Sequence, residues 1–186
     1  MKQIPRPEYP RPDFARAEWL NLNGQWNFDF DDQKLGLKQE WYRQHDFTQE
    51  ITVPYAFQTK LSGIENTGFH DVVWYERTFT VPDKWEGRQI LLHFGAVDYR
   101  ATVWVNGQFV TFHEGGHTSF HANITDALQN GDNKVVVRVE DVSTDLEQPR
   151  GKQYWEENSE GIFYTRTTGM WQTVWLEPVN TAYIER

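Results

Sequence analysis

The sequence predicts an all-β fold, an antiparallel β-sandwich of the jelly-roll kind, and three observations favour it. At least eight short segments have the residue pattern of strands, turn-forming residues separate them, and no strand–helix alternation typical of a parallel sheet occurs. Aromatic residues make up 16% of the 186 residues, with nine Trp among them, and large rings suit pleated, half-buried surfaces. We expect most of these rings in the sandwich core and some on a ligand-facing surface.

The N-terminal segment, residues 1–18, is expected to be an extended arm. It contains four prolines: Pro5, Pro7, Pro10 and Pro12. Proline removes a backbone donor and pushes the preceding residue into an extended conformation, so neither a helix nor a central strand is expected here. Residues 19–186 are predicted to form one jelly-roll domain.

The first strand is predicted where Trp26, Phe28 and Phe30 alternate with polar residues, because a period of two is typical of a strand with one buried face. The segment Gly36–Phe47 is the best candidate for a helix. Apolar and polar positions there recur at offsets of four and three, as on one helix face. A single helical turn is expected at Ile124–Leu128.

The other strands are expected in segments rich in β-branched and aromatic residues: Ile51–Val53, Val72–Val81, Gln89–Phe94, Ala101–Val105, Gln108–Phe112, Lys134–Glu140, Gly161–Arg166 and Met170–Leu176. Asn106-Gly107 lies between two of them, and both residues tolerate a positive φ, which predicts a type I′ hairpin turn. The polar stretch Asp141–Asn158 predicts a long surface loop, and loops of that length are often functional or mobile.

Composition argues against several classes of function. The chain has 18 basic and 27 acidic residues, a net charge of −9, which disfavours nucleic acid and anionic membranes as partners. It has no cysteine, so disulfides and thiolate zinc sites are excluded. No apolar run approaches the ~20 residues of a membrane helix. The first ten residues carry charge and proline instead of the apolar centre of a signal peptide, so we expect a cytoplasmic protein.

The familiar motifs of catalysis and cofactor binding do not occur in the sequence. His113, His117 and His121 have helical spacing, but Gly115-Gly116 between them would break a helix, so a surface loop is the better interpretation and no metal site is expected. There is no GxSxG nucleophile elbow, no phosphate-binding glycine loop and no HExxH. We therefore predict no cofactor.

Five short fragments, in this order along the chain, carry a resemblance to a known family: Leu22–Phe28, Val53–Tyr55, Trp74–Phe79, Val103–Gly107 and Gly169–Leu176. Together they cover about residues 17 to 179. In sequence and order they resemble the N-terminal sugar-binding domain of glycoside hydrolase family 2, which contains β-galactosidases and β-glucuronidases.

The resemblance implies a galactose-binding-like jelly roll that precedes an immunoglobulin-like domain and a catalytic barrel. The two catalytic glutamates of the family lie in that barrel, so we expect no catalytic residue here, and no activity from a fragment of this size. The domain would brace the barrel and line one side of a pocket for β-galactosides or β-glucuronides. One wall of a pocket binds carbohydrate only weakly. A free-standing carbohydrate-binding module and a structural interaction domain without sugar contact are the alternatives.

The resemblance also implies which residues face the sugar. Family members use polar side chains from the loop before the Trp74 strand, where Glu65, Asn66, His70 and Asp71 stand; of these, Asn66 and Asp71 are the best positional matches.

A second contact comes from the stretch before Gly169. Several members place an aspartate six residues before that glycine, where it touches sugar and in some cases an alkali cation, but this chain has Phe163. Tyr164 and Arg166 become the candidates, because their donors suit hydroxyl or carboxylate groups. We expect both pairs of candidates to meet at one end of the sandwich.

Overall fold

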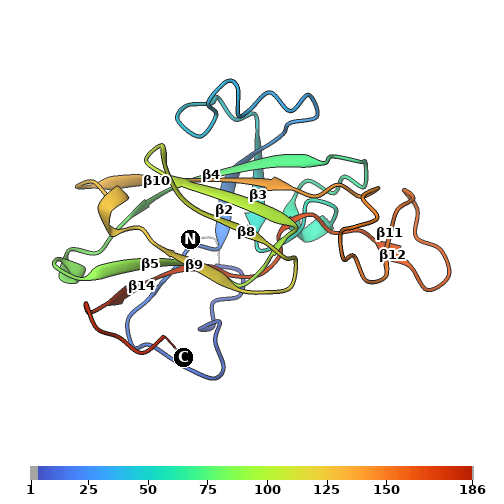
Figure 1. Cartoon of the computed structure of the whole chain (residues 1–186). Coiled ribbons are helices and arrows are strands. Elements are labelled where there is room, and N and C mark those ends of the chain that lie inside the picture. Colours follow the sequence, from blue (N-terminus) through green and yellow to red (C-terminus); the bar gives the residue numbers. More distant parts are fainter. Residues whose placement is uncertain (1–3, 186) are drawn as a thin grey trace.

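The computed structural model describes residues 4–185, and in these residues it contains strands and short 3₁₀ helices but no α-helix (Figure 1). The strands are β1 (Leu20–Asn21), β2 (Gly24–Phe30), β3 (Gln49–Val53), β4 (Val72–Thr80), β5 (Gln89–Phe94), β6 (Val97–Asp98), β7 (Arg100–Val105), β8 (Gln108–Glu114), β9 (Phe120–Asn123), β10 (Asp132–Glu140), β11 (Gln153–Tyr154), β12 (Tyr164–Thr165), β13 (Gly169–Met170) and β14 (Val174–Val179). The 3₁₀ helices are η1 (Lys60–Ser62), η2 (Asp83–Trp85) and η3 (Thr125–Ala127).

Two antiparallel sheets form a sandwich, which confirms the predicted fold class. The larger sheet has the strand order β3-β2-β4-β10-β7-β8 and the smaller one β1-β14-β5-β9. Figure 1 shows the larger sheet above the smaller, with the pair β11–β12 beyond one end of both. Side chains from the two inner faces fill the space between the layers, as in other β-sandwiches.

The core is built from the alternation seen in the sequence. Trp26 and Phe28 of β2 are 1% and 0% exposed, and they pack in one cluster with Tyr75 of β4 and with Leu92 and Leu176 of the smaller sheet. Five of the nine Trp residues are buried, and other rings, such as Trp155 and Tyr164, are exposed on the surface. Burial of such side chains contributes roughly 1.5–3 kcal/mol each.

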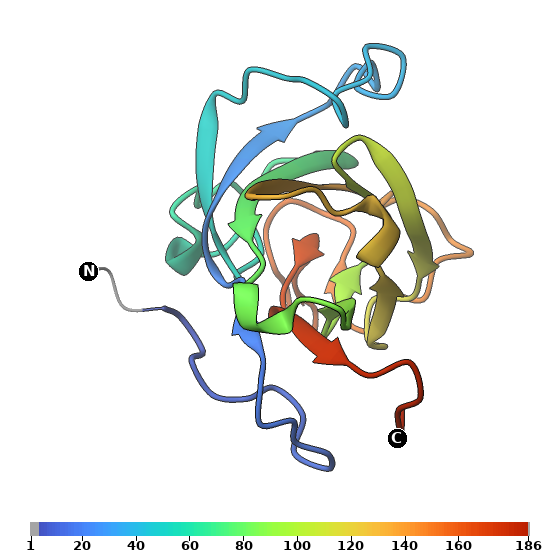
Figure 2. The ribbon, with the colours of Figure 1, turned by 90° about the vertical axis from the view of Figure 1, so that its left-hand side faces the viewer.

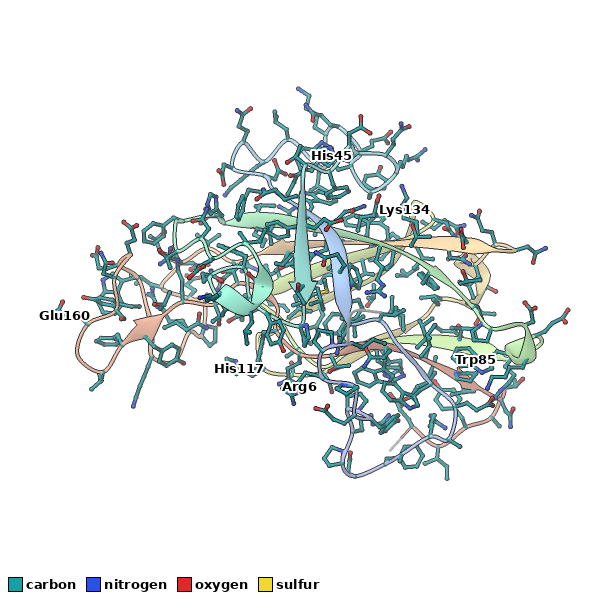
Figure 3. All side chains as sticks on the ribbon, turned by 180° about the vertical axis from the view of Figure 1, so that it is seen from behind. Arg6, His45, Trp85, His117, Lys134 and Glu160 are labelled. Carbon is teal, nitrogen blue, oxygen red and sulfur yellow. The ribbon has the colours of Figure 1, made fainter. Side chains whose placement is uncertain are left out.

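A second, smaller cluster covers the outer face of the larger sheet. Trp74 and Trp104 stack there at 5.6 Å between ring centroids, and Trp41 and Tyr42 of the segment 31–48 pack on them. His45 marks this outer layer in Figure 3, where it lies above the sheet.

The helix predicted at Gly36–Phe47 is wrong, because this segment is a series of turns. Asp31 accepts hydrogen bonds from the backbone N–H groups of Leu35 and Gly36 at 2.8 and 2.9 Å and so holds the chain in a tight turn. The neighbours Trp41 and Tyr42 both reach the aromatic cluster on the sheet, whereas consecutive helix residues point about 100° apart.

The hairpin prediction is confirmed: Asn106 and Gly107 have φ of 50° and 78° between β7 and β8. The turn at η3 falls within the predicted Ile124–Leu128. The last two strand predictions are only partly right. Gly161–Arg166 contributes just β12, which pairs in parallel with β11, and Met170–Leu176 is divided between β13 and β14.

Residues 4–18 contain no helix or strand and lie against the smaller sheet near the end of the chain (Figure 2). The Tyr9 hydroxyl and the Arg16 guanidinium donate hydrogen bonds of 2.5 and 2.7 Å to the buried carboxylate of Glu177 on β14. In residues 4–185, no helix has the length and apolar character needed to cross a membrane.

Candidate functional site

The candidate site lies at the end of the sandwich where β4 begins and β10 ends. Two long connections meet there: residues 54–71 before β4, and residues 141–168 between β10 and β13, which we call the excursion. The backbone N–H of Asp141 donates to the carbonyl of Asp71 at 2.8 Å, so the bases of the two connections are joined. Asn66 and Asp71 belong to the first connection, and Tyr164 and Arg166 to the second.

Arg166 ties the two connections together. Its Nη2 donates to the carbonyl of Thr67, its Nη1 donates to the carbonyl of Glu156 at 3.3 Å, and its guanidinium lies 3.8 Å above the centre of the Phe69 ring. The residue is only 4% exposed, and burial lowers the pKa of its guanidinium. A planar fork that satisfies two carbonyls and covers an aromatic ring is a specific use of arginine.

Asn66 is part of a local hydrogen-bond chain. Its Oδ1 accepts from the N–H of Gly68 at 2.8 Å, and its Nδ2 lies 3.1 Å from Nε2 of His70. Nδ1 of His70 lies 2.8 Å from a carboxylate oxygen of Asp32. A neutral His70 that accepts from Asn66 and donates to Asp32 satisfies every partner, so the amide is held at a defined orientation.

The other two candidates lie farther out. The carboxylate of Asp71 is 35% exposed and forms an ion pair with Lys34 at 3.4 Å. Tyr164 is 50% exposed on β12, and its backbone N–H donates to the carbonyl of Lys152. The structure thus brings Arg166 against the loop that carries Asn66, while Tyr164 belongs to the outer part of the excursion beside β11.

Behind this rim lies a buried polar network that sequence reasoning missed. Asp98 accepts from Nε2 of Gln153 at 2.7 Å. Asp141 accepts from Nε2 of Gln148 at 2.5 Å and from the Thr168 hydroxyl. The two carboxylates belong to residues that are 2% and 6% exposed.

Burial raises the pKa of Asp98 to about 7, and the nearby charge of Asp141 acts in the same direction. Burial also raises the pKa of Asp141, although hydrogen bonds from Thr168 and Gln148 oppose the shift. Groups of this kind are typical of functional sites as well as of structural networks. Neither Asp98 nor Asp141 belongs to a recognisable motif, so no spacing signal in the sequence could have found this network.

Of two cavities in the structure, one borders the candidate site and the other does not. A small one of about 10 Å³, near the size of one water, is lined by Asp141, Gln148 and Arg166 among others. A larger one of about 600 Å³ lies elsewhere, between the N-terminal arm and the smaller sheet, beside His93 and His121. Within the described part of the chain, no group of three or more His, Asp or Glu is arranged to hold a metal ion.

Comparison with known proteins gives consistent matches. The model of the glycosyl hydrolases family 2 sugar binding domain matches residues 20–176. A β-glucuronidase of Felis catus is 38% identical over 133 residues, which cover 66% of this chain and 20% of that protein. A β-glucuronidase of Sus scrofa is 31% identical over 202 aligned residues, covering 95% of this chain and 31% of that protein.

Solved structures agree with these relatives. A β-glucuronidase from Ruminococcus gnavus, in complex with an N1-substituted uronic isofagomine, superposes with a TM-score of 0.71 and 26% identity over 92% of this chain and 31% of that chain. The chain thus spans between a fifth and a third of the length of these matched proteins.

Proposed function

Since this chain belongs to glycosyl hydrolase family 2, as a sugar-binding domain related to those of β-glucuronidases, we propose that it is the non-catalytic part of a retaining β-glycosidase. In that enzyme it braces the catalytic barrel and lines one side of the substrate pocket. Its substrate class is β-glucuronides, because the matched relatives are named β-glucuronidases. The family's two catalytic glutamates belong to the barrel.

The observation that carries the proposal is the convergence at Arg166. This side chain joins the loop of Asn66 to the excursion through the carbonyls of Thr67 and Glu156. Sites are built where polar groups from distant segments meet on a rigid scaffold. Asn66, Asp71 and Tyr164 remain the proposed carbohydrate contacts, with Asn66 held in place by its neighbours. Arg166, whose guanidinium already donates to two carbonyls, is proposed to position the two loops instead of touching the sugar.

Binding by this chain alone is proposed to be weak. Only one wall of the pocket is present, so few contacts offset the entropy lost when a sugar is immobilised. We expect a dissociation constant of roughly millimolar or above for a simple glucuronide.

The test is an NMR titration of the chain with methyl β-glucuronide and, separately, methyl β-galactoside. We expect glucuronide-dependent shifts of the backbone amides of residues 66–71 and 164–168, and loss of these shifts in Asn66→Ala. The matched control is Asn130→Ala. Asn130 is exposed in the turn that precedes β10, and the candidate site lies at the other end of that strand. Shifts confined to other surfaces, or equal loss in the control variant, would refute the proposed site.

A free-standing carbohydrate-binding module is the second candidate, because Trp155 of the excursion is 43% exposed. Such a module binds through its own surface, and its affinity does not depend on a missing barrel. Micromolar binding of an oligosaccharide by the chain alone would favour this candidate over a pocket wall.

A further inference from the structure

The excursion carries aromatic rings that belong to neither hydrophobic cluster of the sandwich. Tyr154 and Phe163 stack with ring centroids 5.2 Å apart and planes 10° apart. Trp155 meets both edge to face, at 4.9 Å from Tyr154 and 5.0 Å from Phe163. We call these three rings the aromatic platform. Ring pairs of this geometry stabilise one another beyond the area they bury, so the platform is an ordered unit.

The platform stays accessible to solvent. Trp155 is 43% exposed, and its neighbours Ile162 and Tyr164 are 69% and 50% exposed. The unit stands at the free end of the molecule: Figure 1 shows β11 and β12 beyond the sandwich, and Figure 3 shows Glu160 at the outer tip of the same excursion. An accessible group of large apolar residues on a protein surface typically marks a binding site.

The base of the platform is fixed to the candidate site on both sides. Gln153, which precedes Tyr154, donates to Asp98 and accepts from the N–H of Thr167 at 2.7 Å each. The carbonyl of Glu156, which follows Trp155, accepts a hydrogen bond from the same Arg166 guanidinium that donates to the carbonyl of Thr67. Only one guanidinium thus separates the backbone beside Trp155 from the loop that carries Asn66. A ligand seated on that loop could extend across to the platform.

The charges around the platform select the chemistry of its ligand. Glu156, Glu157 and Glu160 are exposed beside it. Three cations lie nearby: Lys152 is exposed, Arg150 lies 5.5 Å above the Trp155 ring, and Arg166 donates to the carbonyl of Glu156. The three carboxylates are therefore balanced by three cations, and the platform has no strong net charge that would favour a charged ligand. A neutral flat ring stacks on exposed aromatic side chains and needs no charged partner there.

We propose that the aromatic platform is a subsite for the aglycone, the neutral aryl or sugar ring joined through the glycosidic bond, and that Trp155 provides its main stacking surface. This inference rests on the proposed function, since it assumes that the glycone binds at the loop of Asn66. It assigns the excursion a role in choosing the leaving group, separate from recognition of the glucuronate.

The test compares phenyl β-glucuronide with methyl β-glucuronide in ligand-observed NMR titrations of the chain, carried to roughly tens of millimolar ligand. The two ligands share the glycone and differ only in the aglycone. We expect the phenyl glycoside to bind about tenfold more tightly. Trp155→Ala should abolish this advantage, and Trp155→Phe should keep part of it. The control Phe112→Ala removes a similarly exposed ring on β8, 53% exposed, and should keep the advantage in full.

Equal binding of the two glycosides, or an unchanged phenyl advantage in Trp155→Ala, overturns the aglycone subsite and leaves the proposed function intact. Phenyl binding that needs Trp155 while no methyl glycoside binds upholds the platform and refutes the glycone contact at Asn66. Failure of both glycosides to bind refutes both.

Discussion

At the scale of single residues, Gly169 is the position where the backbone leaves least room. Its φ is +102°, and a Cβ built on it would overlap the hydroxyl of Tyr75, which is fully buried in the core. We expect Gly169→Ala to lower the free energy of unfolding by about 3 kcal/mol, from overpacking together with a strained backbone. Urea denaturation measures the loss.

The matched control is Gly131→Ala, with a φ of +81° but no atom within 4 Å of the new Cβ. It carries the backbone strain alone, about 1 kcal/mol. Removing the hydroxyl with Tyr75→Phe in the Gly169→Ala background should restore part of the stability. Equal losses in the two glycine variants would show that contact with Tyr75 is unimportant.

The raised pKa of Asp98 leads to a prediction about how stability depends on pH. Its pKa lies at about 7 in the folded protein against an ordinary 3.8, so between these values the folded state binds more protons than the unfolded state. Stability therefore falls as pH rises through this window. Asp98→Asn keeps an acceptor for Gln153 and removes the charge. We expect it to be more stable than the original chain above pH 7, by a few kcal/mol at most, and the difference to vanish towards pH 4.

Denaturation curves across this pH range measure the effect. The control Asp126→Asn also removes one negative charge, at an exposed position of η3, so it reports the effect of net charge alone. Stability profiles of Asp98→Asn and Asp126→Asn that run parallel would contradict a special role for Asp98.

The candidate site illustrates what sequence can predict at this scale. Arg166 could be selected because the resemblance implies a sugar contact shortly before Gly169, and a guanidinium there can donate to hydroxyl or carboxylate groups. Asp98 and Asp141 could not, because neither belongs to a recognisable motif and their relation exists only after β6 and the end of β10 come together. The hydrogen bonds that bury them come from Gln153, Gln148 and Thr168, residue types that are ordinary in loops.

At the scale of elements, the strands with strict alternation and clear turns were predictable, and the segments held by long-range contacts were not. The alternation of Trp26, Phe28 and Phe30 in β2 and the Asn106-Gly107 turn follow from local pattern alone. The turns at 36–47 depend on Asp31, and the break after β13 depends on Trp171, whose indole N–H donates to the carbonyl of Gly116 at 2.8 Å. Tertiary hydrogen bonds of this kind override local periodicity.

The ion pair that attaches the N-terminal arm to the smaller sheet leads to a prediction about stability at this scale. Arg16 and Arg6 each form an ion pair of 2.7 Å with a glutamate, but Glu177 is fully buried, whereas both partners of the Arg6–Glu8 pair are more than half exposed. Although burial opposes it, His93 at 3.4 Å and the hydrogen bonds from Tyr9 and Trp175 lower the pKa of Glu177 to about 2. Glu177 therefore keeps its charge when Arg16 is lost.

Arg16→Ala should therefore cost about 3 kcal/mol of unfolding free energy, because it leaves a buried charge without its cation. Arg6→Ala should cost less than ~0.5 kcal/mol, as exposed pairs do. Thermal and urea unfolding of the two variants decide this. Similar small losses in both would show that the arm contributes little to the stability of the sheet.

At the scale of the whole molecule, the last prediction concerns whether this chain alone can hydrolyse a glycoside. Retaining glycosidases cleave with two carboxyl groups about 5–5.5 Å apart in one cleft. The chain spans between a fifth and a third of its relatives, and its paired acids Asp98 and Asp141 are buried and bonded to glutamine and threonine side chains. Groups held in that way cannot reach a glycosidic bond.

We therefore expect the purified chain not to hydrolyse 4-nitrophenyl β-glucuronide or β-galactoside above the rate without protein, measured by nitrophenolate release. Turnover that copurifies with the chain and disappears in Asp98→Asn or Asp141→Asn would contradict this, whereas turnover that both variants retain comes from a contaminating host enzyme.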